Sequence, residues 1–364
     1  MENQMLDRIK GSYFAAAIGD AMGGPVETMH YSKIQKTLGK VEEFMEYKSP
    51  PCHMHIDYDA FPTALRPHPG SYTDDTRGRN LMASAVIEKG GRITADDFSA
   101  VLVRDINPEQ WWPAVMVAYY KIKNYGMAPR DAGLGNPPGG GVAWYSPIGI
   151  INAGDSRQAA WDTFDVCSFL KRDSDRDLAS AVPAAVAEAL MPDSTIDSVV
   201  EMAMKYINND SAAYIERAVE LARKSSTIEQ FYEGFYSNLL VEWDAAFQLK
   251  VKGLHPEAMT SCDLREQVAA AIGMFYFCKG DPKETIIATV NYGRDSDTIS
   301  TTAGSIAGAF KGAKALPQEW VKTSLEANPD PDMNEICEKL YEILIKELNA
   351  KERRVKLFQD IDVI

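Results

Sequence analysis

The sequence predicts an all-α fold. Apolar residues recur at helical spacing in several stretches, and the apolar–polar alternation that is typical of strands is hard to find. Hydrophobic residues make up 45% of the 364 residues and charged residues 25%, which is an ordinary balance for a globular protein. This length suits one large domain or two ordinary ones. We therefore expect a bundle of many helices.

The predicted helices follow one another along the chain. The first runs through residues 5–18. A second passes through Leu81 and ends at Gly90-Gly91, because glycine commonly ends helices. Asp332 and Glu335 match a capping box, which predicts that the last helix begins there. Further stripes of apolar or small side chains predict helices at residues 214–222, 264–275, 299–311 and 336–348.

Two long stretches interrupt these helices and read as irregular. Residues 47–72 hold five prolines, and residues 127–155 are rich in glycine and proline. Long loops inside a compact domain are more often functional than idle. We expect both loops to lie near the acidic clusters described below, if those clusters meet.

The bulk composition argues against several classes of function. A formal net charge of −14 disfavours binding to a nucleic-acid backbone, which needs clustered lysine and arginine. The five cysteines are scattered and form no CxxC pair, so we expect a reducing compartment rather than a disulfide framework. The chain shows neither a secretory signal nor a run of about 18 apolar residues. A cytoplasmic location without a membrane span is the expectation.

Two acidic clusters carry the strongest functional signal. They are Thr73-Asp74-Asp75-Thr76 and Asp295-Ser296-Asp297-Thr298, and each precedes a helix-like stretch. Together they offer carboxylate and hydroxyl oxygens, which suit hard cations such as Mg²⁺, Mn²⁺ or Ca²⁺. The alternative is that each cluster only caps a helix, since threonine and aspartate are favoured there. Two coincidental caps explain the pattern less well than one metal centre.

A third segment, Gly19-Asp20-Ala21-Met22-Gly23-Gly24-Pro25-Val26-Glu27, follows the first helix. Its glycines and proline end that helix and place Glu27 in a loop. Glu27 is therefore a candidate ligand or base beside the metals. The alternative is an ordinary surface carboxylate, the usual place of glutamate.

The three motifs together resemble the ADP-ribosylglycohydrolase family, in their order and spacing over roughly residues 8–315. The resemblance implies a single multi-helix orthogonal bundle with a dinuclear site for two Mg²⁺ or Mn²⁺ ions. It also implies hydrolysis of the glycosidic bond between ADP-ribose, or a related ribosyl group, and an acceptor. We expect a catalytic domain at residues 1–330, with residues 331–364 forming a C-terminal helix and tail packed on it.

The resemblance also implies roles for single residues. Glu27 matches the glutamate at the edge of the family's site, and Asp20 matches an aspartate that supports the site. Glu27, Asp74 and Asp75 are the candidate bases that accept a proton from metal-activated water, and the sequence does not decide among them. The implied metal ligands are Thr73, Asp74, Asp75, Asp295, Asp297 and Thr298.

The chain departs from the family's pattern before the substrate pocket. Where relatives often carry a Met-Arg pair, this sequence has Ala143-Trp144, which puts phosphate recognition in doubt. Trp144 and Tyr145 are candidates to stack on a base or another flat group, and simple loop packing is the alternative. Asn136 and Gly149 complete the predicted substrate-binding set. The expected partner is an ADP-ribosylated protein or a small ribosylated molecule.

Two other functions stay open beside the main one. The first is an N-glycoside hydrolase that acts on nucleosides or other small ribosylated molecules, which the missing Met-Arg pair favours. The second is a non-catalytic, metal-binding relative, which the intact ligand set disfavours. Cys52-His53-Met54-His55 holds residue types that bind zinc, but the set is tightly spaced and no second ligand pair lies at a usual distance, which argues against a zinc site.

Overall fold

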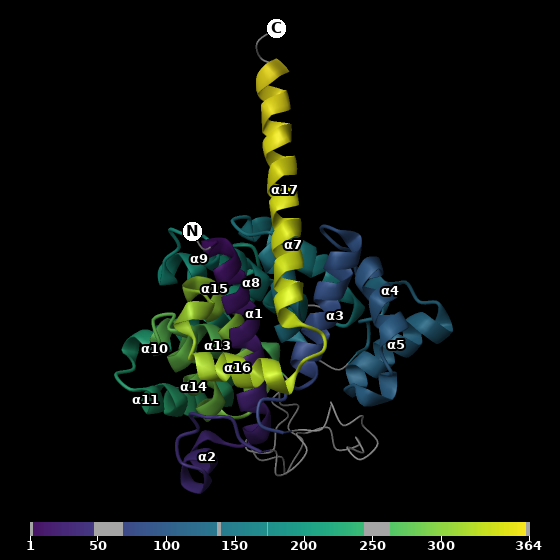
Figure 1. Cartoon of the computed structure of the whole chain (residues 1–364). Coiled ribbons are helices and arrows are strands. Elements are labelled where there is room, and N and C mark those ends of the chain that lie inside the picture. The colour runs from purple at the N-terminus through teal and green to yellow at the C-terminus, as the bar shows by residue number, and fades with distance from the viewer. Residues whose placement is uncertain (1–2, 47–67, 137–139, 173, 244–262, 362–364) are drawn as a thin grey trace.

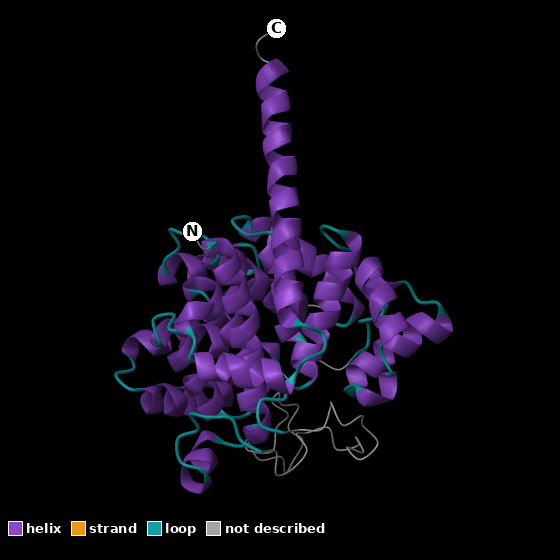
Figure 2. Ribbon diagram, viewed as in Figure 1, coloured by secondary structure: helices purple, strands orange, loops and turns teal. Residues whose placement is uncertain are grey.

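The computed structural model describes residues 3–46, 68–136, 140–172, 174–243 and 263–361. Within these ranges the regular secondary structure is helical and no strand occurs (Figure 2). An isolated antiparallel β-bridge joins His30 and Gly293. The predicted all-α class is confirmed.

The helices are numbered as in Figure 1. The α-helices are α1 (Gln4–Gly23), α2 (Tyr31–Thr37), α3 (Asp74–Lys89), α4 (Ala95–Asp105), α5 (Pro113–Tyr125), α6 (Ser146–Ile151), α7 (Ser156–Val166), α8 (Ser174–Ala189), α9 (Ile196–Lys205), α10 (Asn209–Lys224), α11 (Ile228–Gly234), α13 (Leu264–Phe277), α14 (Pro282–Tyr292), α15 (Ser296–Lys311), α16 (Gln318–Ala327) and α17 (Met333–Ile361). Short 3₁₀ helices span Gly24–Val26, Pro108–Gln110, Pro129–Asp131, Val142–Tyr145, Cys167–Phe169 and Ala313–Ala315, and a π-helix spans Phe235–Leu240.

Local signals explain where several helices begin and end. The side chain of Asn3 accepts hydrogen bonds from the first turn of α1. Gly90 ends α3 at φ 67°, in the left-handed region that glycine adopts without strain. Before α17, the carboxylate of Asp332 accepts a hydrogen bond from the Asn334 amide at 2.8 Å. The helices predicted around residues 5–18, 81–89 and 336–348 are thus confirmed.

Helices α1 and α15 lie unusually close, in antiparallel directions, because small residues line their contact. A Cβ atom added at Gly308 would lie 2.0 Å from the Gly11 carbonyl oxygen. One added at Gly23 would lie 2.6 Å from the Asp297 Cα. Glycine at these positions therefore sets the distance between the two backbones. The end of α1 meets the start of α15, which is where the second acidic cluster lies.

The prediction of an irregular stretch at residues 127–155 is wrong in part. Residues Val142–Tyr145 form a 3₁₀ helix that leads directly into α6. Pro147 stands in the first turn of α6, where its missing N–H costs nothing, so this proline starts a helix instead of breaking one. In the other predicted loop, residues 47–67 lie outside the described residues, and with them the possible zinc ligands Cys52 to His55.

One large apolar core draws on both ends of the chain. It includes Ile9 and Tyr13 from α1 as well as Leu340 and Leu344 from α17. The division at residue 330 remains a prediction. Within the described ranges, every helix is too short or too polar to cross a membrane.

Candidate metal centre

The two acidic clusters meet in the folded chain. Thr298 donates a hydrogen bond from Oγ1 to Oδ2 of Asp75 at 2.6 Å, across 223 positions of sequence. Both clusters also begin helices, since Thr73 is the N-cap of α3 and Asp295 that of α15. The Thr73 hydroxyl accepts a hydrogen bond from the Asp75 amide at 3.2 Å, as a capping residue does. In the first cluster, capping and convergence, which the sequence presented as alternatives, therefore occur together, whereas the Asp295 side chain makes no capping hydrogen bond.

The carboxylate of Asp20, which belongs to neither cluster, holds the first cluster in place. Asp20 is fully buried near the end of α1 and accepts hydrogen bonds from the Thr73 amide at 3.1 Å and its hydroxyl at 2.7 Å. It also accepts one from the Thr76 amide at 2.9 Å. Burial outweighs these bonds and raises the pKa of Asp20 to about 6. The position agrees with a supporting role for Asp20.

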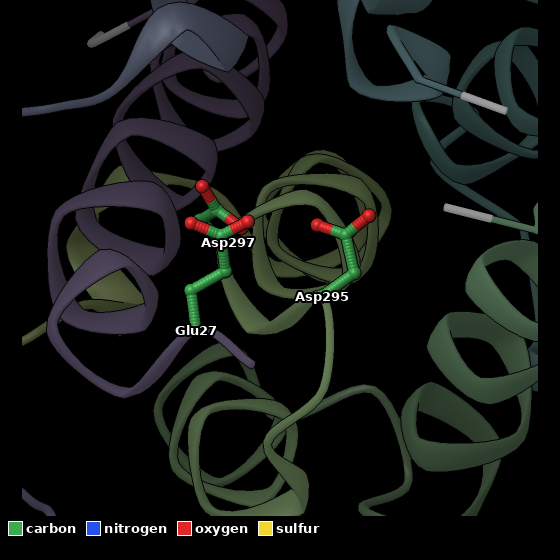
Figure 3. A group of neighbouring side chains, drawn as sticks. All are labelled: Glu27, Asp295 and Asp297. Atoms are coloured by element: carbon green, nitrogen blue, oxygen red, sulfur yellow. The ribbon is translucent and has the colours of Figure 1, made fainter. Parts of the chain in front are cut away.

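Glu27 lies close to the second cluster. It follows the 3₁₀ helix Gly24–Val26, and its carboxylate has oxygen atoms within 4.8 Å of those of Asp295 and Asp297. Figure 3 shows the side chains of Glu27 and Asp297 pointing toward one another at the start of α15, with Asp295 beside them. This is a group of three carboxylates close enough together to bind one cation.

The carboxylates of the cluster are buried close to one another, an arrangement that a positive charge would stabilise. Burial raises the pKa of Asp75 well above its ordinary value, and the negative charges of Asp74, Asp20 and Asp295 raise it further. Burial also raises the pKa of Asp297, with Glu27 as the largest charge contribution. Like charges this close disfavour joint ionisation unless a cation lies among them.

The remaining predicted ligands border the same space. Asp74 is the first residue of α3 and is half-buried, whereas Thr73 and Thr298 are buried with 8% and 6% exposure. All six predicted ligands thus lie at the facing ends of α3 and α15. Their assignment as metal ligands remains a prediction.

A buried ion pair that the sequence analysis did not predict supports the second cluster. Arg294 donates to Glu266 of α13 from Nη2 at 2.6 Å and from Nε at 2.7 Å. Tyr292 donates its hydroxyl to the same carboxylate at 2.9 Å, and Gln267 donates to Asp295. The available signal was Glu266-Gln267 within the otherwise apolar stretch of α13, since polar residues on a buried helix need partners.

The loop before α15 is also held from the Glu27 side. The Arg294 amide donates to the Met29 carbonyl at 2.7 Å, and the Thr28 amide donates to the Arg294 carbonyl at 2.6 Å. Arg294 adopts φ 59°, a left-handed conformation that is uncommon for a residue with a side chain. The ion pair with Glu266 and these two bonds together hold that conformation.

The predicted stacking residues lie inside the core. Trp144 has 1% exposure and Tyr145 none. Trp144 meets the edge of Trp111 at 5.6 Å between ring centroids and lies on Gly78, whose added Cβ would stand 2.1 Å from the indole. In this arrangement Trp144 offers no open face to a ligand. Substrate contact by Trp144 and Tyr145 remains a prediction that requires these side chains to move.

The other two predicted substrate residues are buried as well. The Asn136 side chain accepts a hydrogen bond at Oδ1 from Lys121 at 2.8 Å, and its Nδ2 donates to the Leu170 backbone carbonyl at 3.3 Å. Gly149 packs on α8, where an added Cβ would stand 2.6 Å from the Pro183 carbonyl oxygen. A role in substrate binding stays a prediction for both.

Comparison with known proteins agrees with the motifs. A family model described as ADP-ribosylglycohydrolase matches residues 1–350. The chain belongs to the ADP-ribosylglycohydrolase family. This is a hydrolase family, and membership supports the cleavage of glycosidic bonds in ADP-ribosylated substrates.

Relatives and a solved structure extend the similarity over nearly the whole chain. An uncharacterized Escherichia coli protein, YegU, is 24% identical, covering 90% of this chain and 94% of its own length. An uncharacterized Archaeoglobus fulgidus protein is 25% identical, covering 93% of this chain and 97% of its own length. The ADP-ribosylhydrolase ARH3 of Bos taurus is 22% identical, covering 94% of each chain. A solved ADP-ribosylglycohydrolase-related protein complex superposes with a TM-score of 0.64 at 19% identity, covering 94% of this chain and 99% of that one. That likeness confirms the fold.

Proposed function

We propose that this member of the family is a metal-dependent hydrolase that cleaves the bond between ADP-ribose, or a related ribosyl group, and an acceptor. One observation carries the proposal. The facing ends of α3 and α15 meet through the 2.6 Å bond between Thr298 and Asp75, beside the carboxylates of Glu27, Asp295 and Asp297. A buried group of this charge is costly without a bound cation.

The donor set fits Mg²⁺ or Mn²⁺. Every side chain in the cluster offers oxygen, and hard divalent cations prefer carboxylate and hydroxyl oxygens. The residues that would hold two cations are Thr73, Asp74, Asp75, Asp295, Asp297 and Thr298, with Glu27 at the edge. Bound cations would supply Lewis-acid charge that orients ribose hydroxyls and lowers the pKa of water.

The protein's own residues supply positioning and proton transfer. Asp20 holds Thr73 and the start of α3, while Glu266 and Arg294 hold the loop that leads to Asp295. The candidate bases are Glu27, Asp74 and Asp75, of which Glu27 and Asp74 are half-buried and so reach both water and the cluster. The reaction needs no nucleophilic serine or cysteine.

A second candidate is the hydrolysis of nucleosides or other small ribosylated molecules. The observation that favours it is the Ala143-Trp144 pair, where both side chains are buried and neither offers a cation to a pyrophosphate. The similarity to a protein named ADP-ribosylhydrolase favours the ADP-ribosyl substrate instead. We place the reaction in the cytoplasm, on an ADP-ribosylated protein or a small ribosylated molecule.

The test is turnover of defined substrates by protein stripped of metal. ADP-ribosyl-arginine, ADP-ribosyl-serine and free nucleosides are incubated with and without added Mg²⁺ or Mn²⁺. We expect cation-dependent release of ribose or ADP-ribose, and a loss of at least about 100-fold in Asp74→Asn and Asp297→Asn, with helical circular dichroism retained. Asp197→Asn, on the exposed surface of α9, is the control and keeps full activity.

Two results would overturn the proposal. Full activity in excess chelator after stripping would show that the reaction needs no cation. Tight cation binding without turnover of any ribosyl compound would instead support a non-catalytic relative.

A further inference from the structure

The C-terminal half of α17 extends beyond the rest of the molecule. Lys351 forms an ion pair with Asp155, the N-cap of α7, at 2.7 Å, and this is the last side-chain bond between α17 and the body in the described residues. The following residues 352–361, here called the tip, remain helical and stand clear of the body (Figure 1). Ten helical residues span about 15 Å.

The tip continues the face that α17 buries elsewhere. In the body, Cys337, Leu340 and Leu344 lie on one face of α17 with at most 1% exposure. The same face continues to a set of exposed residues, here called the apolar stripe, which Lys351 interrupts between Leu348 and Val355. The apolar stripe consists of Leu348, Val355 and Phe358, with 40%, 55% and 68% exposure.

The tip is the end of the 29-residue helix α17, and in proteins most helical stability comes from packing of the apolar face. The positions from Cys337 to Phe358 are separated by 3, 4, 4, 7 and 3 residues, and steps of three, four and seven residues are typical of helices that pack lengthwise on other helices. The structure therefore points to a second helix along the apolar stripe.

We propose that the partner is a second copy of this chain, with the two tips packed side by side in antiparallel directions about a two-fold axis. Under such symmetry one apolar stripe covers the other, so no different protein is required. Charge favours this occupant. Residues 351–361 carry four basic and two acidic residues, residues 333–350 of the same helix carry four acidic and two basic, and the whole chain has a formal charge of −14.

The charge distribution also selects the direction of pairing. In an antiparallel pair, each basic tip points toward the acidic body of the other copy, and the two bodies lie at opposite ends. A parallel pair would align the basic tips and bring two acidic bodies together. The same negative charge disfavours an anionic membrane as the occupant.

The end of each tip then reaches the partner's body near α7. Specific interfaces bury about 1,000 Å² or more, which exceeds what two three-turn segments cover alone. Helix α7 begins after its N-cap Asp155, close to the point where the tip leaves the body. In this helix, the side chains of Trp161 and Phe164 are 55% and 39% exposed. These side chains offer the additional apolar surface.

The experiment is light scattering coupled to size exclusion, on the full chain over a wide range of concentrations. We expect twice the mass of one chain for the wild type, with association weakened by added salt. Val355→Glu and Phe358→Glu should each raise the dissociation constant at least about 100-fold, because each side chain is lost twice across the axis. A chain that ends at Ala350 should be monomeric.

Leu357→Glu is the matched control. Leu357 is exposed to 54% on the same tip but lies on the opposite side of α17 from the apolar stripe, so its replacement should leave the dimer intact. A wild type that is monomeric at every concentration would overturn the proposal, and so would equal dissociation by Leu357→Glu. A monomer that binds vesicles of phosphatidylserine would assign the tip to membranes instead.

Discussion

Replacing Arg294 by methionine should lower the free energy of unfolding by about 3–5 kcal/mol. The arginine is paired with Glu266 through two hydrogen bonds of 2.6 and 2.7 Å, and the glutamate side chain is 1% exposed. Methionine fills much of the same volume but leaves that carboxylate in the interior without its counter-charge. The cost is therefore mainly that of an unpaired buried charge, not of lost packing.

A double variant separates these two contributions. Changing Glu266 to glutamine in the Arg294→Met background removes the unpaired charge and keeps an oxygen acceptor for the Tyr292 hydroxyl. We expect the double variant to recover most of the lost stability. The left-handed backbone at position 294 does not affect the comparison, because arginine and methionine are equally strained at φ 59°.

Urea denaturation, followed by circular dichroism, measures the effect. The control is Arg217→Met, which breaks an ion pair of the same 2.6 Å length with Glu242. The side chains of Arg217 and Glu242 are 36% and 62% exposed. That change should cost less than about 1 kcal/mol. The reasoning fails if Arg294→Met costs no more than Arg217→Met, or if the double variant is no more stable than the single one.

Three further predictions concern packing and charge. Gly308→Ala should lower stability by about 1–3 kcal/mol in thermal unfolding, because its Cβ would lie 2.0 Å from the Gly11 carbonyl oxygen; an unchanged melting temperature would contradict this contact. Gly78→Ala should cost a similar amount in urea, since its Cβ would meet the Trp144 indole at 2.1 Å, and a neutral result would mean that the indole is not held there. Cation-free protein should lose stability as the pH rises from 4 to 7, with Asp20 contributing on the order of 2 kcal/mol, since a pKa raised to about 6 favours the protonated folded state at low pH and that stability is lost as pH rises. Saturating Mg²⁺ should reduce this loss in melting experiments, and identical pH profiles with and without Mg²⁺ would count against the metal centre.

The sequence predicted the helices well where their ends carry chemical signals. Gly90 marked the end of α3 because only a left-handed residue closes the helix there. The Gly- and Pro-rich stretch around Pro147 was misjudged, because the same proline that breaks a helix interior also begins a helix. Composition alone does not distinguish these positions.

The meeting of the two acidic clusters was predictable in part. Repeated pairs of carboxylates before helices signalled Asp74, Asp75, Asp295 and Asp297, and the fold brings these helix starts together. The support from Glu266 was not predictable, because its partner Arg294 lies 28 positions away and the pairing depends on how α13 packs. The burial of Trp144 likewise depends on Gly78, a contact between distant segments that local patterns do not encode.

The contact between Asp75 and Thr298 has a consequence for how the protein is made. A ribosome completes Glu27 and Asp75 long before it reaches Thr298, so the growing chain carries one half of the cluster without the other. The intervening residues must be synthesised and ordered before the halves meet, and closing so long a loop is slow. The two halves of the cluster can therefore meet only late in folding. Chains halted before α15 would lack the second half.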